Sequence, residues 1–287
     1  MRALFSSLLL SLLACGGGDR RPARPLEDAG TTAPVDADRP DVPPRMGIDG
    51  GGLDDVQVWA HSPRELYRFD PRTEAVALVG RFVTADGEPA EDMTDLAVDG
   101  FGNLYTCSFT RLYRVRADDA VVTEIGALGV ADTVRFNSLT FVPAGELDES
   151  AEVLVAANAE GELYRVDVAS GSATRLGTFS DGYGSSGDIV SVLGAGTFAT
   201  VFREDLDRDW LVRVDLRTGA VMPIGSTGTS RLFGLGYWRN RLYGFNSFGW
   251  LYVIDTETGE ARLSTSDTGA DLFYGAGVTT NAPTAPI

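Results

Sequence analysis

The sequence of 287 residues has no lysine, a single histidine and only two cysteines. One histidine, His61, cannot form the clusters that hold zinc, and no serine–histidine–aspartate spacing accompanies it. We therefore expect His61 to be a solvated turn residue. Two cysteines exclude a disulfide framework. We expect Cys107 to be a buried and unreactive thiol within a strand, since a nucleophilic cysteine needs a base beside it.

Positive charge is also scarce, because 41 acidic residues outnumber 24 arginines and give a formal net charge of −17. Such a charge disfavours nucleic acids and anionic lipids as partners, and it favours cations or basic surfaces. Solubility alone would also explain it. The hydrophobic fraction of 44% is that of a soluble protein with a buried core. We expect a monomer that binds no nucleic acid.

The apolar run at residues 3–13 has 11 residues, whereas a membrane span takes about 20. It follows Arg2, as in the core of a signal peptide. The run ends in Leu-Leu-Ala-Cys-Gly at residues 12–16, which resembles the bacterial lipobox. The resemblance implies that residues 1–14 are a lipoprotein signal peptide and that Cys15 is acylated. Several acyl chains would hold the protein on a membrane. In the lipoprotein sorting rule of enterobacteria, an aspartate directly after the acylated cysteine retains the protein at the inner membrane. Gly16 follows Cys15 here, so we expect attachment to the outer membrane, facing the periplasm or the surface.

The segment at residues 15–52 is rich in proline, aspartate and glycine and has almost no large apolar side chains. It cannot bury enough surface to offset the entropy of ordering. We expect a disordered tether there, with the folded domain at residues 53–287.

One unit recurs five times in that domain. It alternates large apolar and polar residues, as in Leu-Tyr-Arg-Val-Asp, breaks at a turn and alternates again, which is typical of a β-hairpin. The copies occupy residues 66–80, 112–126, 163–177, 211–225 and 251–263. We expect the turn aspartates Asp167, Asp215 and Asp255 to be structural, because an aspartate can accept hydrogen bonds from the amides just ahead of it.

Two more strand-like runs precede each hairpin, except that the first copy has only one. The equivalent of the missing run lies at residues 274–278. A C-terminal strand that completes the first blade closes a ring and leaves no edge unpaired. The copies begin 40 to 51 residues apart, which suits a four-stranded blade. The sequence therefore predicts an all-β fold, a β-propeller of five four-stranded blades closed by the C-terminal strand.

The Leu-Tyr-x-Val-Asp-x-x-Thr-Gly pattern of the hairpins resembles the repeats of the YVTN and quinoprotein-like propeller superfamily over most of residues 56–280. The resemblance implies an architecture and no particular activity. Quinoprotein dehydrogenase repeats carry a tryptophan shortly after Thr-Gly, and residues 220–223 and 260–263 have none. Five blades are also too few for those enzymes, so we expect no quinone cofactor.

In a propeller, the loops that enter each first strand and those that join second to third strands share one face around the central channel. We call it the entry face and expect function there, because loops on a rigid scaffold carry it. Within the channel, Asp95 and Asp188 occupy equivalent first-strand positions, and Ser138 occupies a third. Paired carboxylates could cleave glycosides, as in five-bladed sugar-cleaving propellers, or they could hold water.

The loop with Asp205, Asp207 and Asp209 has the alternating carboxylates of a calcium site. Because Trp210 stands where calcium loops usually have glycine, and no glutamate closes the site, a solvated hairpin tip is the other interpretation.

Trp210 and Trp250 share a repeat position where other copies have charged residues, so we expect both to be exposed. Exposed tryptophans could stack on sugars or anchor a protein partner, together with Tyr183 on the same face, or they could pack against neighbouring loops.

Three hypotheses for function follow. The first is a non-catalytic binding or scaffold lipoprotein of the cell envelope that holds an envelope protein or a glycan and needs no cofactor. The second is a carbohydrate-active enzyme, a glycoside hydrolase or lyase, with Asp95 and Asp188 as catalytic residues. The third is a protein stabilised by calcium at the loop of residues 205–209.

Overall fold

The computed structural model describes residues 58–285. The chain divides into two units, Met1–Arg45 and Met46–Ile287, and every described residue belongs to the second. The predicted signal peptide, Cys15 and the predicted tether at residues 15–52 lie outside the described residues. Within residues 58–285 the single helical segment is the 3-10 turn η1 (Ser180–Gly182), so no helix there could cross a membrane.

The strands form five antiparallel sheets of four strands each. The first sheet has the order β20 (Gly275–Val278), β1 (Val58–His61), β2 (Glu65–Asp70) and β3 (Ala75–Arg81). The second contains β4 (Asp95–Val98), β5 (Leu104–Cys107), β6 (Arg111–Val115) and β7 (Val122–Ala127). The third contains β8 (Phe136–Val142), β9 (Val153–Asn158), β10 (Glu162–Val166) and β11 (Ala173–Thr178). The fourth contains β12 (Gly184–Val192), β13 (Gly196–Phe202), β14 (Trp210–Asp215) and β15 (Ala220–Ser226). The fifth contains β16 (Leu232–Trp238), β17 (Arg241–Asn246), β18 (Leu251–Ile254) and β19 (Ala261–Thr265).

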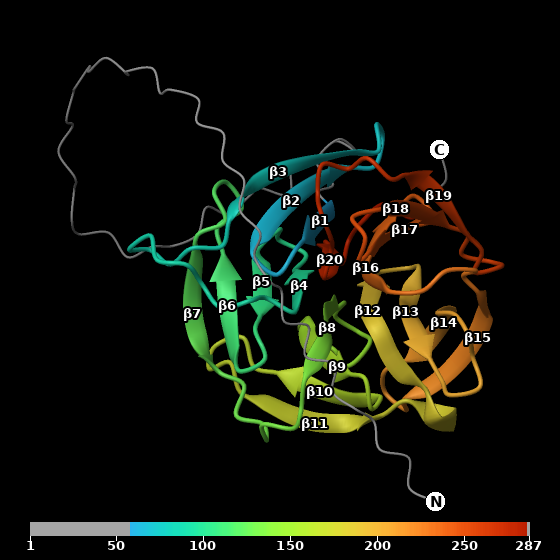
Figure 1. Cartoon of the computed structure of the whole chain (residues 1–287). Coiled ribbons are helices and arrows are strands. Elements are labelled where there is room, and N and C mark those ends of the chain that lie inside the picture. The colour runs from blue at the N-terminus through green and yellow to red at the C-terminus, as the bar shows by residue number, and fades with distance from the viewer. Residues whose placement is uncertain (1–57, 286–287) are drawn as a thin grey trace, which may run out of the picture. The chain divides into compact units, whose positions relative to one another are not determined.

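The five sheets stand as blades in a ring (Figure 1). Each innermost strand packs against the next, in the order β4, β8, β12, β16, β20 and back to β4. The strand β20 pairs with β1 from Val58↔Val278 to His61↔Gly275, so the end of the chain completes the first blade. The predicted five-bladed propeller and its closure by the C-terminal strand are both confirmed.

The hairpin turns follow from the repeated aspartate and glycine. The Asp167 carboxylate accepts hydrogen bonds of 2.8 Å from the amides of Ala169 and Ser170, as predicted, and these bonds lower its pKa. Gly171 then has a φ of 80°, which glycine adopts without strain. A Cβ at Gly171 would also lie 2.7 Å from the carbonyl oxygen of Gly126 in the neighbouring blade. The turn glycine therefore serves both the hairpin and the contact between blades.

Aromatic side chains fill the spaces between neighbouring blades. Phe69 of the first blade packs edge-to-face against Phe245 of the fifth, with ring centroids 5.3 Å apart. Tyr105 of the second blade packs in the same way against Phe141 of the third, at 5.2 Å. Pairs of this kind contribute about 0.5–1.5 kcal/mol beyond the area that they bury.

Closure of the ring depends on a glycine in the last strand, which gives the first prediction. A Cβ at Gly275 would collide with the Asp95 carboxylate and the His61 ring, whereas a Cβ at Gly177 on β11 would meet nothing within 4 Å. We expect Gly275→Ala to lower the free energy of unfolding by about 1–3 kcal/mol, the usual effect of overpacking. Gly177→Ala should leave it nearly unchanged. Chemical denaturation of both variants measures the difference, and equal stability would contradict this account of closure.

Candidate functional site

The five first strands present one equivalent residue each at the centre of the ring. These residues are Asp95, Ser138, Asp188, Gly234 and Gly275. The two aspartates and the serine are fully buried. The structure therefore brings Asp95 and Asp188 together in the ring, as the sequence predicts, but away from solvent.

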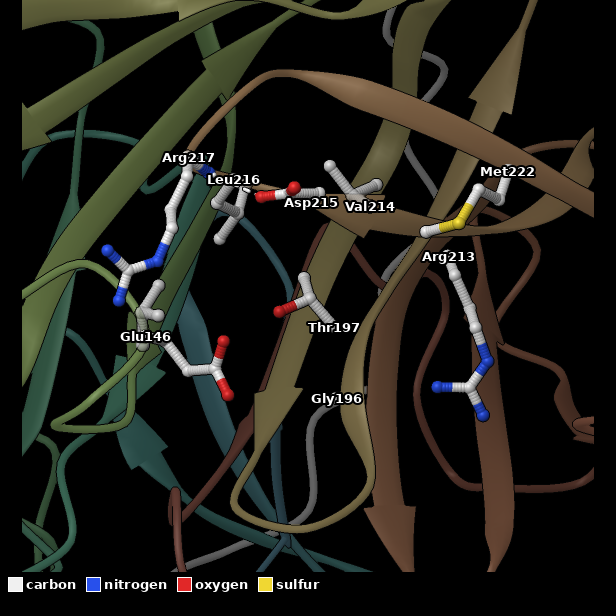
Figure 2. A pocket seen from close by; sticks show the side chains of 10 residues that line it. Glu146, Gly196, Thr197, Arg213, Val214, Asp215, Leu216, Arg217 and Met222 are labelled. Carbon is white, nitrogen blue, oxygen red and sulfur yellow. Dashed lines mark hydrogen bonds between the residues drawn. The ribbon is translucent and has the colours of Figure 1, made fainter.

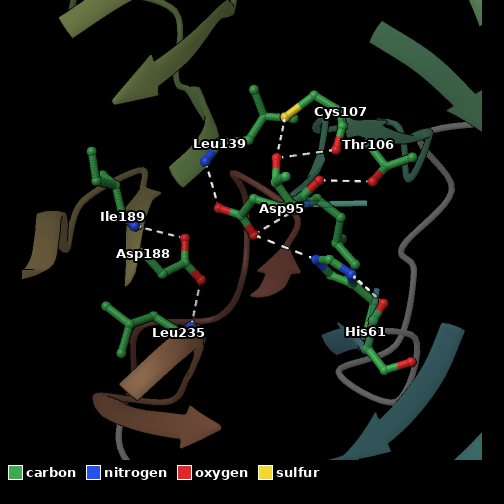
Figure 3. Close-up of polar contacts among 11 residues, drawn as sticks. His61, Asp95, Thr106, Cys107, Leu139, Asp188, Ile189 and Leu235 are labelled. Atoms are coloured by element: carbon green, nitrogen blue, oxygen red, sulfur yellow. Dashed lines mark hydrogen bonds and ion pairs between the residues drawn. The ribbon is translucent and has the colours of Figure 1, made fainter. Parts of the chain in front are cut away.

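Each aspartate links its own blade to the next (Figure 3). The Asp95 carboxylate accepts hydrogen bonds from the Leu96 amide at 2.8 Å and from the Leu139 amide on β8 at 2.5 Å. The Asp188 carboxylate accepts equivalent bonds from the Ile189 amide at 2.6 Å and, on β16, from the Leu235 amide at 2.5 Å. Between these two junctions, the Ser138 hydroxyl contacts the Ser185 hydroxyl on β12 at 2.5 Å. The polar residues of the centre thus connect neighbouring blades.

His61 lies beside this pair, and the expectation that it is solvated is wrong. It is the last residue of β1 and is fully buried. Its Nδ1 donates to the Ser62 carbonyl oxygen at 2.8 Å, and its Nε2 lies 3.8 Å from Asp95 Oδ1. Burial lowers the pKa of His61 to about 4, so the ring is neutral at pH 7.

Cys107 is buried, as predicted. Its Sγ lies 3.4 Å from Thr94 Oγ1, and burial raises its pKa to about 11, so it stays a thiol. The centre of the ring therefore holds two carboxyl groups, a neutral imidazole and a thiol, all without exposed surface. A glycoside would have to contact the carboxyl groups directly to be cleaved. Their burial favours a structural role.

The three aspartates of the predicted calcium loop point to different surroundings. Asp205 is exposed and pairs with Arg203 at 2.5 Å, and Asp207 is exposed with Arg208 at 3.7 Å. Asp209 is buried and accepts a hydrogen bond of 2.9 Å from the Leu232 amide, and burial raises its pKa to about 6. Across residues 58–285, no three acidic, cysteine or histidine side chains are grouped so that they could hold a metal ion.

The two predicted tryptophans differ in exposure. Trp250 is 37% exposed and packs at 5.7 Å against Phe248. Trp210 is half-buried against the apolar cluster between the third and fourth blades, together with Leu206 of its own loop. Tyr183 is buried, with the Arg203 guanidinium 4.5 Å from its ring centroid. Of these three aromatic residues, Trp250 has the largest exposed fraction.

Exposed aromatic side chains gather on the entry face. Five of the six exposed aromatic residues in the described part of the chain lie there: Phe109, Phe202, Phe248, Trp250 and Tyr274. The sixth, Phe101, lies in the β4–β5 loop on the opposite face. Sequence reasoning missed four of the five. Aligning the repeats finds two, because Ser-Phe occurs three residues before the Leu-Tyr of both the second and the fifth hairpin, at Phe109 and Phe248.

Arginines cover two of these rings. The Arg135 guanidinium lies 4.8 Å from the centroid of Phe109, and that of Arg231 lies 5.6 Å from the centroid of Phe248. Both arginines are exposed and come from loops that enter a first strand. The entry face therefore presents aromatic surface and guanidinium donors side by side.

A cavity of about 210 Å³ lies on the other face, between the third and fourth blades (Figure 2). Its two arginines already bind main-chain oxygens: Arg213 donates to Ala195 at 2.7 Å and Arg217 to Gly145 at 2.6 Å. These bonds hold the surrounding loops in place.

The fold and these sites define a β-propeller built from repeats. Residues 97–239, from β4 to just past β16, match the family model of a repeat of unknown function (DUF6923). No curated protein matches the chain.

Solved structures are similar at low identity. One is a protein of unknown function from Bacteroides caccae, with 10% identity over 73% of this chain and 72% of that chain, at a TM-score of 0.41. Another is the propeller of Dos1, with 17% identity over 69% of this chain and 53% of the other, at 0.38. A third is hydrazine synthase from Kuenenia stuttgartiensis, with 14% identity over 74% and 62%, at 0.40. These similarities carry no information on function.

Access to the ring centre can be measured through Cys107. In a chain of residues 16–287, we expect a thiol reagent to label Cys107 only after denaturation, since the side chain is buried and protonated. The reaction should slow by a factor of about 10³ or more in the native state, because it then needs an opening of the fold. Rapid labelling of the folded protein would show that small molecules reach the carboxyl pair, and it would favour the enzyme hypothesis.

Proposed function

We propose that the protein is a non-catalytic binding module of the cell envelope, and that it holds an envelope protein or a glycan on the entry face. The observation that carries this proposal is the gathering of exposed aromatic residues on one face of the ring. Acidic residues do not distinguish the faces, since Asp86 and Asp267 lie in entry-face loops and Asp118 and Glu149 lie on the other side.

The arrangement of Phe248, Trp250 and Arg231 supports a binding role. Trp250 and Phe248 are in contact, and the Arg231 guanidinium lies over Phe248, so two rings and a cation form one exposed patch. Aromatic and arginine side chains dominate the energetics of protein interfaces, and aromatic faces also stack on sugars. The Asn246 side chain holds this loop by accepting bonds from the Phe248 and Trp250 amides, both at 3.0 Å. The patch is therefore ordered before a ligand binds, which reduces the entropy cost of binding.

A binding experiment tests the entry face directly. The bait is the chain of residues 16–287, and the probes are native envelope proteins and envelope polysaccharide. We expect the double variant Phe248→Ala/Trp250→Ala to lose binding by a factor of about 10–100, the range for two interface aromatics. Phe101→Ala, an exposed aromatic on the opposite face, should bind like the wild type.

Three results would count against the entry face: loss of binding in the Phe101 variant, full binding by the double variant, or no binding of either probe by the wild type. In the last case turnover of glycans by the wild type becomes the next measurement, with Asp95→Asn/Asp188→Asn as the inactive control.

Membrane attachment is a separate part of the proposal. It rests on the resemblance of residues 12–16 to a lipobox, and it places the propeller at the outer membrane with residues 15–52 as a tether. We expect the wild type to incorporate labelled fatty acid and to sediment with membranes. Cys15→Ser should lose the label and retain the leader, since the acylated cysteine is the new N-terminus. Incorporation of label by Cys15→Ser would contradict the assignment.

A further inference from the structure

We propose that Asp95 and Asp188 share a single proton at the centre of the ring, and that this proton holds the first strands together. The propeller is then a pH-sensitive assembly that loosens as the surroundings become alkaline. This inference concerns the ring itself and does not depend on what the entry face binds.

The pair keeps one proton because its members are buried close together. The Asp188 carboxylate accepts hydrogen bonds from the amides of Ile189 and Leu235. The Asp95 carboxylate accepts hydrogen bonds from the amides of Leu96 and Leu139. Both carboxyl groups are fully buried and lie close enough for their charges to interact. Two buried carboxyl groups this close cannot both ionise without strong repulsion, so one of them keeps a proton. Asp95 is the member that faces the neutral His61 ring, and it therefore carries the proton.

Within residues 58–285, no arginine pairs with either carboxyl group to compensate two negative charges. From β1 the pair faces His61, which is neutral, and from β5 it faces Cys107, which is a thiol. From β8 and β16 it meets main-chain amides, and the residue of β20 that lies against Asp95 is Gly275. Burial and, for Asp95, repulsion from Asp188 raise the pKa of both aspartates well above the usual value. The pair titrates as one unit, as two close carboxyl groups do.

The His61 ring fits a protonated neighbour. Its Nδ1–H is used by the Ser62 carbonyl oxygen, so the buried Nε2 carries a lone pair and has no hydrogen-bond partner in the described structure. That lone pair faces Asp95 Oδ1 at 3.8 Å. A lone pair facing an ionised carboxylate in a buried site is unfavourable, whereas one facing a carboxylic acid is not.

The pH dependence has a definite sign. In the unfolded chain both aspartates ionise near pH 4, whereas the folded pair keeps one proton to a higher pH. The folded state then binds one proton more than the unfolded state, so the stability from this site is present at acidic pH and is lost as the pH rises. Exposed aspartates such as Asp167, whose pKa is lowered, act in the opposite direction and only at low pH.

The site also reaches the entry face. The His61 carbonyl oxygen accepts a hydrogen bond of 2.7 Å from the amide of Tyr274, one of the exposed aromatic residues. His61 therefore connects Asp95 in the centre of the ring to Tyr274 on the entry face. Loosening at the centre would be transmitted to Tyr274 through a main-chain bond.

The test compares the pH dependence of unfolding in the chain of residues 16–287 and in its Asp95→Asn variant. An asparagine amide can donate to Asp188 without a titrating proton. Between pH 5 and pH 8 we expect the unfolding constant of the wild type, divided by that of the variant, to rise about tenfold per pH unit, the slope for one linked proton. Asp209→Asn is the matched control, because Asp209 is also buried and has a pKa raised to about 6. Replacing Asp209 should leave the pH dependence of unfolding above pH 7 as it is in the wild type.

Two outcomes would overturn the proposal. One is an Asp95→Asn variant with the same pH dependence as the wild type. The other comes from carbon-13 NMR of aspartate carboxyl groups in the wild type, which needs no variant: it should show one buried carboxyl group still protonated at pH 7, and full ionisation of all of them would exclude a shared proton. Asp95→Ala should be unstable at every pH, since it leaves the Leu139 amide without an acceptor.

Discussion

The structure depends on how five innermost strands meet around one axis. The strands of one blade pair with each other, but the first strands of different blades do not, so they pack side by side without a shared ladder of hydrogen bonds. Their equivalent central positions cannot all carry a side chain. Two carboxyl groups and a serine fill the space, and Gly234 and Gly275 leave room for them, since a Cβ at either would collide with its neighbours. The choice of residue at these five positions sets how closely the blades approach.

The same constraint explains why the centre is polar. The amides of Leu139 and Leu235 lie at blade junctions where no strand partner is available, and a buried amide without an acceptor destabilises a fold by about 1–3 kcal/mol. An aspartate side chain on the preceding blade is long enough to bring its carboxylate within hydrogen-bond distance of such an amide. Two aspartates that resemble a catalytic pair in the sequence therefore follow from the architecture, because a purely apolar centre would leave these amides unpaired.

The repeats were sufficient to predict the fold. The burial of individual site residues could be predicted only by comparing equivalent positions in the five repeats. The hairpin pattern and the displaced last strand were sufficient for five blades and their closure. His61 was misjudged because it was considered alone. It occupies the repeat position of Cys107, Ala157 and Phe245, all of them buried, and that comparison predicts burial. Trp210 could not be placed in this way, because its exposure depends on the long loop before it, whose Leu206 packs into the same apolar cluster.

A propeller separates the residues that hold the ring from those that can change without disturbing it. The first strands have little freedom, whereas the loops of the entry face differ in length and composition from blade to blade, and those of the fifth blade carry the contact between Phe248 and Trp250. A rigid ring holds such a patch in one arrangement, which lowers the ordering cost of any contact made there. The bond from the Tyr274 amide to His61 is the exception to this separation, since it joins an exposed aromatic of the rim to the buried carboxyl pair. The blade that the two ends of the domain complete together therefore connects the centre of the ring to the entry face.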